Sequence, residues 1–281
     1  MLMRLKAAYV SLYMTGSVIL SAFAAWQILS GAPVLSWSGV LLAALPMTAL
    51  ISLLMIRPLL ARTRPHLPEI HLLTLAGVVI AASGFQHSLL PTALASVAYG
   101  GFLLYVYWYS RYQRQPGRII RPGFPLPDVE LTDQNGQVFT TTALTAKPAV
   151  WLFYRGNWCP LCMAQIREIA SEYREIEQLG ADVILISPQP HAQTEALARR
   201  MQVNFRYMTD THNQAARTLG IVSDFGIPTG LEVLGYDTEA PMPTVIITAA
   251  GGKVLWADET DNYRVRPEPG VFLKVLREQG A

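Results

Sequence analysis

The chain contains two cysteines among its 281 residues, and they stand three positions apart in the stretch FYRGNWCPLC. Cys159 and Cys162 could serve as a redox-active dithiol, as two ligands of a metal site, or as two inert core residues. A structural zinc site takes four ligands, and the histidines nearest in sequence to the pair, His191 and His212, lack the spacing of a zinc finger. We therefore expect redox chemistry with neither a metal nor another cofactor.

The position of the two cysteines along the chain favours this chemistry. Residues 149–154 (AVWLFY) form an apolar run typical of a buried strand, and Pro160 is a residue favoured in the first turn of a helix. Cys159 should then cap this helix, where free N–H groups and the helix dipole stabilise a thiolate and lower its pKa. Cys162, one turn further on, would attack a mixed disulfide formed at Cys159.

Alternating strands and helices surround the cysteine stretch. Apolar residues spaced by three and four predict a helix over 160–179, and a second buried strand follows at 182–187. The turn DQNG at 133–136 predicts a hairpin between 128–131 and 137–140. Further helices are expected at 191–202, 212–219 and 268–279, and further strands at 205–208, 244–248 and 253–256. These elements predict a central sheet with helices on both faces.

The first part of the chain differs in composition from the rest. Residues 1–110 hold one acidic and five basic residues, whereas residues 111–281 hold 19 acidic and 17 basic ones. Apolar runs, most of them long enough to cross about 30 Å of hydrocarbon as helices, occur at 7–29, 34–56, 70–85 and 92–109. We therefore expect an all-α membrane domain of about four transmembrane helices over 1–110, a linker over 111–127, and an α/β domain over 128–281.

The basic residues predict how the membrane domain is oriented. Two basic residues precede the first apolar run, three lie between the second and third runs, and four follow the fourth run, which makes nine. The connections between the first and second runs and between the third and fourth runs contain none. This positive-inside pattern places both termini and the α/β domain in the cytoplasm, with the lipid bilayer of the inner membrane as a partner. The sequence shows no basic face, so we do not expect nucleic acid as a partner.

Several stretches of the α/β domain resemble the thioredoxin superfamily, and more closely its redoxin branch, the alkyl hydroperoxide reductase/thiol-specific antioxidant group of peroxiredoxin-like proteins. The stretches are PGFPLPD at 122–128, DQNG at 133–136, FYRGNWCPLC at 153–162, ISP at 186–188 and MPTVII at 242–247. The resemblance covers residues 122–280 and implies a thioredoxin fold, a central mixed sheet flanked by helices. It also implies that Pro243 is a cis-proline facing the cysteines, with the backbone of Met242 offered to the substrate.

The chain departs from the pattern with which peroxiredoxins bind peroxide. In their Pro-x-x-x-Thr-x-x-Cys motif the proline falls on Arg155, the threonine on Cys159 and the peroxide-attacking cysteine on Cys162. Their later arginine falls near Met242. These departures favour a thiol–disulfide oxidoreductase in which Cys159 attacks a disulfide and Cys162 resolves the intermediate.

Neighbouring residues complete the predicted site, in which Trp158, Arg155, Met242 and Pro243 are expected to bind the substrate. Arg155 or Arg264 is expected to supply a cation near the thiolate, and Trp158 to pack over the sulfur of Cys159. Because the chain has no third cysteine, an external thiol reductant of the thioredoxin or glutathione type must regenerate the dithiol. Two alternatives stay open: a thiol-dependent peroxidase, and a non-catalytic membrane module whose dithiol senses redox state or binds metal.

The predicted topology can be tested with reporters fused after Ala281. We expect a reporter that works only in the cytoplasm to be active, because nine basic residues flank the cytoplasmic ends of the apolar runs. Activity of a periplasmic reporter at the same position would contradict this orientation.

Overall fold

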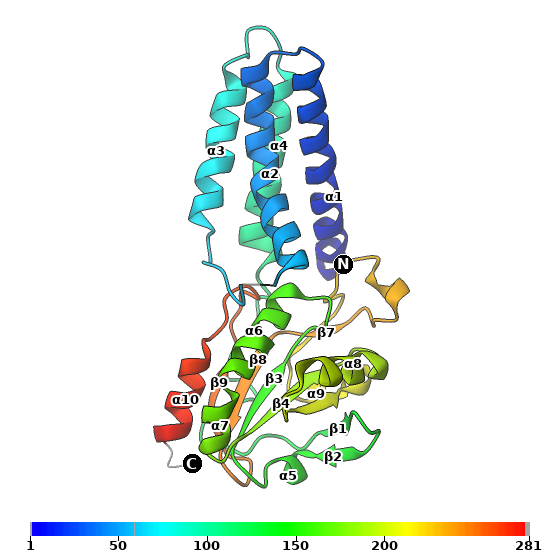
Figure 1. Ribbon diagram of the computed structural model, residues 1–281, viewed down its shortest axis with the longest axis vertical. Coiled ribbons are helices and arrows are strands. Elements are labelled where there is room, and N and C mark those ends of the chain that lie inside the picture. The colour runs from blue at the N-terminus through cyan, green and yellow to red at the C-terminus, as the bar shows by residue number, and fades with distance from the viewer. Residues whose placement is uncertain (1, 59, 279–281) are drawn as a thin grey trace. The chain divides into compact units, whose positions relative to one another are not determined.

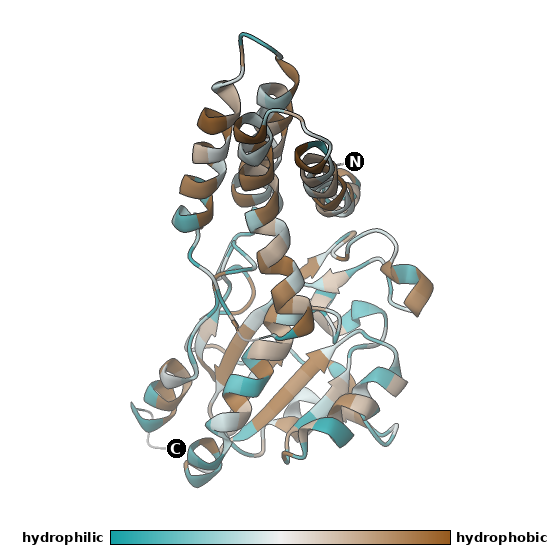
Figure 2. Ribbon diagram, turned by 45° about the horizontal axis from the view of Figure 1, so that its top comes forward, coloured by the Kyte–Doolittle hydropathy of each residue, from teal (hydrophilic) through white to brown (hydrophobic). Residues whose placement is uncertain are grey.

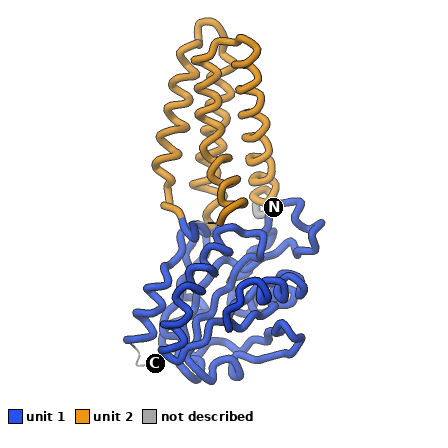
Figure 3. Tube along the Cα trace, in the orientation of Figure 1, with its two compact units in different colours: residues 1–4, 59–62, 112–281 blue, residues 5–58, 63–111 orange. Residues whose placement is uncertain are grey.

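The computed structural model describes residues 2–58 and 60–278. The chain forms two compact units (Figure 3), one made of residues 5–58 and 63–111 and the other mainly of residues 112–278. The first unit is entirely helical, and the second carries the sheet and both cysteines. The boundary between them falls at residues 111 and 112.

The helical unit contains four α-helices (Figure 1). They are α1 (Leu2–Leu29), α2 (Val34–Ile56), α3 (Pro68–Ala82) and α4 (Leu90–Leu104), and α4 continues into a π-helical turn at Tyr105–Tyr109. By length and composition, three stretches could cross a membrane: residues 4–29, 34–56 and 90–109. Because α3 has only 15 residues, or about 22 Å of helix, the count of four spans stays a prediction.

Small residues let α2 and α3 approach each other closely. A Cβ atom added at Gly39 of α2 would lie 2.3 Å from the backbone nitrogen of Ala81, and one added at Gly77 of α3 would lie 2.5 Å from that of Ala43. The buried cluster of this unit is accordingly rich in alanine. Close backbone approach through glycine and alanine is typical of helix pairs in membranes, where dispersion contacts replace the hydrophobic effect.

The second unit is built on a seven-stranded mixed sheet in the order β2-β1-β5-β4-β3-β8-β9. Its strands are β1 (Glu130–Asp133), β2 (Val138–Thr140), β3 (Ala149–Phe153), β4 (Asp182–Ser187), β5 (Arg206–Thr209), β8 (Thr244–Thr248) and β9 (Val254–Asp258). Strand β3 runs parallel to β4 and antiparallel to β8, and β4 runs parallel to β5. A separate small sheet pairs β6 (Val222–Ser223) with β7 (Ala240–Pro241).

Helices flank this sheet as the sequence predicts. They are α5 (Thr141–Leu144), α6 (Pro160–Ser171), α7 (Tyr173–Gln178), α8 (His191–Met201), α9 (Gln214–Thr218) and α10 (Pro269–Glu278). The succession β3-α6-β4-α8-β5, followed by β8-β9-α10, is that of a thioredoxin fold. Every residue of β3 and β8 is buried, so the middle of the sheet is apolar on both faces (Figure 2).

Most predicted elements of this unit are confirmed, with differences at their ends. Asp133 caps the predicted hairpin turn by accepting hydrogen bonds from the backbone N–H groups of Asn135 and Gln137, both at 2.8 Å. The helix predicted over 160–179 is interrupted at Glu172, whose backbone leaves helical geometry (φ −95°, ψ 4°). The helix predicted over 212–219 begins as a 3₁₀ turn (Thr211–Asn213). Gln279, predicted at the end of the last helix, lies outside the described residues.

The segment expected as a linker packs against the sheet domain. The N–H of Gly123 donates to the carbonyl of Val254 at 2.8 Å, and the N–H of Leu126 donates to the carbonyl of Gly252 at 2.8 Å. Ile120 is 1% exposed and belongs to the main hydrophobic cluster. The Arg114 side chain forms a buried ion pair with Glu259 at 3.1 Å. Residues 112–127 are therefore part of the sheet unit and not a free connection.

Candidate active site

The two cysteines lie where β3 leads into α6, as predicted. Cys159 is the N-cap of α6, with extended backbone geometry (φ −87°, ψ 107°), and its Sγ accepts a hydrogen bond from the N–H of Cys162 at 3.4 Å. The two Sγ atoms are 2.6 Å apart, and both residues are free thiols. Cys159 is 2% exposed and Cys162 0%. The pair is therefore close enough for sulfur exchange and shielded from bulk water.

Arg266 supplies the positive charge beside the sulfurs. Its Nη2 donates to the Sγ of Cys162 at 3.4 Å and lies 3.8 Å from the Sγ of Cys159. Its Nη1 donates to Oε1 of Gln165, on the same face of α6, at 2.9 Å. The Arg266 side chain is buried, and a buried guanidinium is tolerated only where acceptors or anions surround it.

Sequence reasoning missed Arg266. It stands in the run DETDNYRVRPEP between β9 and α10, which contains two arginines, and the prediction singled out Arg264. Arg264 is also buried, at 2% exposure, but the contacts to the sulfurs come from Arg266. The sequence pattern that could have indicated Arg266 is the pair of arginines in the short segment before the last helix. The sequence does not show that this segment passes the cysteines, whereas the fold does.

The side chain of Arg155 packs between two aromatic rings, and its positive charge acts on Cys159, where it opposes the rise in pKa. Its guanidinium lies between two rings, 4.6 Å from the centroid of Trp158 and 5.2 Å from that of Tyr263, and it donates to the carbonyl of Gly226. The ring of Trp158 packs on Arg155, and its position over the sulfur of Cys159 stays a prediction. Arg155 also acts on the site through its backbone N–H, which donates to Cys162.

The pKa values of the two thiols are shifted in opposite directions. Burial alone would raise the pKa of Cys162, but the hydrogen bond from Cys159, the charge of Arg266 and the N–H of Arg155 outweigh it and lower this pKa to about 5. Burial, together with the hydrogen bond and charge of Cys162, raises the pKa of Cys159 well above its usual value. The predicted lowering at Cys159 is therefore wrong: the pair shares one negative charge, and Cys162 has more donors to hold it.

Pro243 and Met242 do not form the predicted docking edge. The described residues contain no cis peptide bond, so Pro243 is trans, as most prolines in folded proteins are. The N–H of Met242 donates to the carbonyl of Ile221 at 2.7 Å, and its own carbonyl accepts from the hydroxyl of Thr244 at 2.8 Å. The backbone that was expected to bind substrate is thus already paired within the core, where the side chain of Met242 is also buried.

A buried polar network holds the loop between β3 and α6. Oε1 of Gln189 accepts from the N–H of Asn157 at 2.9 Å, and its Nε2 donates to the hydroxyl of Tyr154 at 3.0 Å. Gln189 is 1% exposed and follows the end of β4, next to the loop in the parallel sheet. Among the residues that the structure describes, no group of three or more His, Cys, Asp or Glu side chains is placed to hold a metal ion.

Comparison with known proteins assigns this part of the chain. Residues 122–257 match the profile of the AhpC/TSA family. This segment, just under half of the chain, is similar to that family. Arg266 and the helical unit lie outside the matched residues. The position near Met242 at which the family pattern has an arginine holds none in this chain. Arg266, which follows the matched segment, contacts the thiols instead.

Several relatives share this domain. The chain is 29% identical over 122 residues to "Peroxiredoxin Q, chloroplastic" of Triticum aestivum, which covers 43% of this chain and 56% of that protein. The same protein of Sedum lineare is 28% identical over 119 residues, covering 42% of this chain and 64% of that protein. The chain thus spans between half and two thirds of the length of these relatives.

Solved structures are similar at lower sequence identity. The structure of peroxidoxin BcpB from Mycobacterium tuberculosis matches 56% of this chain and 96% of its own, with a TM-score of 0.47 and 19% identity. Peroxiredoxin Q from Xanthomonas campestris matches 61% of this chain and 99% of its own, with a TM-score of 0.44 and 14% identity.

The assignment of the charge to Arg266 can be tested by titration. Arg266→Met should raise the pKa of Cys162, because the buried thiolate loses its counter-charge while burial remains. The ultraviolet absorbance of the thiolate, followed against pH, should give a midpoint of about 5 in the unmodified protein and a higher one in the variant. Arg266→Lys should keep part of the effect, and Arg118→Met, at an exposed position of the same domain, should have none. An unchanged midpoint in Arg266→Met would contradict the assignment.

Proposed function

We propose that the redoxin domain is a thiol-dependent peroxidase in which Cys162 attacks the peroxide and Cys159 resolves the product. The contact between Arg266 and the Sγ of Cys162 carries this proposal, because it joins a cation to the thiol whose pKa is lowered to about 5. At neutral pH that thiol is ionised, and a thiolate is the form that attacks peroxides. The family register also favours Cys162 as the attacking residue.

The burial of the sulfurs favours a small or slender substrate. With exposures of 2% and 0%, neither sulfur presents a surface on which a folded protein disulfide could dock. A peroxide needs only one oxygen to reach the Sγ of Cys162. Arg266 then lies where negative charge develops on the leaving oxygen, and donors placed in this way stabilise transition states by several kcal/mol.

The reaction balances with the groups at hand and one external reductant. The thiolate of Cys162 attacks the peroxide ROOH, the O–O bond breaks, and a proton completes the alcohol ROH, which leaves Cys162 as a sulfenic acid. The Sγ of Cys159, 2.6 Å away in the reduced protein, then attacks the sulfenic sulfur and releases water, which forms a Cys159–Cys162 disulfide. A thioredoxin- or glutathione-type thiol returns two electrons and regenerates the dithiol.

This order of events differs from the thiol–disulfide oxidoreductase predicted at first. That prediction depended on three missing features of the peroxide-binding pattern, its proline, its threonine and its arginine. Arg266 supplies a cation in place of the arginine, while the proline and the threonine are still absent from their positions. One observation still favours the earlier alternative: Cys159 caps α6, as the attacking cysteine of a disulfide reductase would. We also propose that this domain lies on the cytoplasmic side of the membrane, supported by the basic residues that flank the apolar helices.

The cysteine roles can be tested with single variants treated with one equivalent of hydrogen peroxide. Cys159→Ser should accumulate a sulfenic acid at Cys162, because the attacking thiolate remains and the resolving sulfur is lost. Cys162→Ser should react more slowly, since burial still raises the pKa of the Cys159 thiol and its contact to Arg266 is longer, at 3.8 Å against 3.4 Å for Cys162. Mass spectrometry after trapping with a sulfenic-acid reagent locates the modified residue. A sulfenic acid that forms readily on Cys159 in the Cys162→Ser protein would reverse the roles, and no reaction in either variant would refute the peroxidase proposal.

A further inference from the structure

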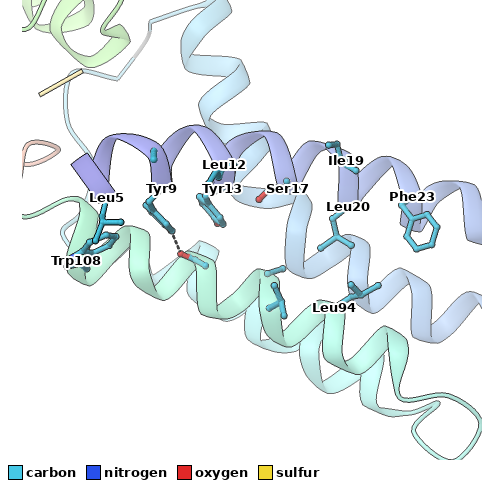
Figure 4. A pocket seen from close by; sticks show the side chains of 15 residues that line it. Leu5, Tyr9, Leu12, Tyr13, Ser17, Ile19, Leu20, Phe23, Leu94 and Trp108 are labelled. Atoms are coloured by element: carbon cyan, nitrogen blue, oxygen red, sulfur yellow. Dashed lines mark hydrogen bonds between the residues drawn. The ribbon is translucent and has the colours of Figure 1, made fainter. Parts of the chain in front are cut away.

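The helical unit contains a crevice between α1 and α4 that the redox chemistry does not use. Its volume is about 720 Å³, and it is lined almost entirely by apolar side chains. The lining residues run along α1 from Leu5 to Phe23, a distance of about 27 Å at 1.5 Å per residue. In Figure 4 the side chains of Tyr9, Tyr13 and Leu20 point from α1 towards α4. The crevice is therefore long in the direction of the helices and apolar, and its volume is that of a ligand site.

The crevice beside α1 is open, whereas close backbone contact leaves no such space between α2 and α3. A Cβ added at Gly16, which lines the crevice, would have no atom within 4 Å, in contrast to the backbone clashes at Gly39 and Gly77 between α2 and α3. A transmembrane helix 10–12 Å across and about 27 Å long would occupy more than about 2,000 Å³, well above the volume of about 720 Å³ that the crevice offers. One extended hydrocarbon chain is slender enough for this volume.

Three hydroxyl groups interrupt the apolar lining, those of Tyr9, Tyr13 and Ser17. Tyr13 and Ser17 line the crevice one helical turn apart. They lie about 12–18 Å from the level of Leu5, near the middle of the crevice. Their two hydroxyls offer two donors and up to four acceptor sites. The pair can therefore bind an oxygen-bearing group inside an otherwise apolar crevice.

The hydroxyl of Tyr9, the other tyrosine of the crevice, already has a hydrogen-bond partner. The hydroxyl of Tyr9 donates to the carbonyl of Gly101 on α4, and the ring of Tyr13 packs where a Cβ of Gly101 would lie, 2.7 Å from Cε2 (Figure 4). These contacts hold the two tyrosines in place against α4. The position of the Tyr13 ring is thus held by packing, which is what a site needs in order to select one ligand over another.

We propose that this crevice binds one hydrocarbon chain of an oxidised membrane lipid, whose mid-chain oxygen group is hydrogen-bonded by Tyr13 and Ser17. An ordinary acyl chain is apolar at this depth and would offer these two hydroxyls no hydrogen-bond partner, which costs free energy in an apolar medium. A hydroxyl or hydroperoxyl group partway along the chain uses it. The proposal concerns the helical unit alone and does not depend on the reaction at Cys162.

The test compares two free fatty acids that differ by one oxygen. The full chain, in nanodiscs of saturated phosphatidylcholine, is loaded with a fluorescent acyl probe, which is then displaced with octadecadienoic acid or with its 13-hydroxy derivative. One additional hydrogen bond should make the hydroxylated acid about three- to tenfold more effective. In the double variant Tyr13→Phe, Ser17→Ala the two acids should displace the probe equally well, and the plain acid should bind as it does to the unmodified protein.

A filled crevice provides the second arm of this test. Gly16→Leu places a side chain in open space and should weaken both acids at least tenfold, whereas Gly100→Leu, also at an unobstructed position but outside the lining, should change neither. Equal displacement by both acids with the unmodified protein would reduce the site to a general lipid groove and overturn the proposal. Full binding to Gly16→Leu, or a change in oligomeric state caused by that variant, would overturn it too, since the crevice would then not be the site or would hold a second copy.

Discussion

A single buried charge contact, between the guanidinium of Arg266 and the thiolate of Cys162, determines how this site can work. Both groups are shielded from water, and burying either charge alone would be costly. The two opposite charges compensate each other when they are buried together. The low local dielectric makes each charge costly to bury alone, and it also strengthens the attraction between them. The thioredoxin fold provides the framework for this contact: β3 delivers the cysteines to the first turn of α6, and the segment after β9 brings the arginine to the same point.

The same contact explains why the two thiols differ. Cys159 has the position at the helix N-terminus that usually stabilises a thiolate, and its Sγ does accept the N–H of Cys162. With the two sulfurs 2.6 Å apart, however, only one can be ionised without strong repulsion. Cys162 has the shorter contact to Arg266 and the N–H of Arg155 in addition, so it keeps the charge. Cys159 stays protonated beside it, as suits a resolving residue.

Local patterns in the sequence predicted much of this arrangement. The limits of β4 and β8 were predicted correctly, and β3 to within one residue, because continuous apolar runs bounded by polar residues mark strands buried on both faces. Pro160 likewise marked the start of α6. Arg266 could not be found in this way, because it lies 104 residues from Cys162 along the chain and nothing local distinguishes it from Arg264. Which of the two thiols has the lower pKa could not be predicted from the sequence for a similar reason. The argument from the helix N-terminus considers one sulfur at a time, whereas in the structure the two sulfurs interact.

The central claim is that Arg266 keeps Cys162 ionised across the physiological pH range. It is tested most directly by the second-order rate constant of the reduced protein with hydrogen peroxide, measured by stopped flow from acid to mildly alkaline pH. The rate follows the thiolate fraction, so with a pKa of about 5 it should rise through acid pH and be flat from about pH 6 to pH 8. A rate that continued to rise about tenfold per pH unit up to pH 8 would show an ordinary thiol at the site and contradict the account.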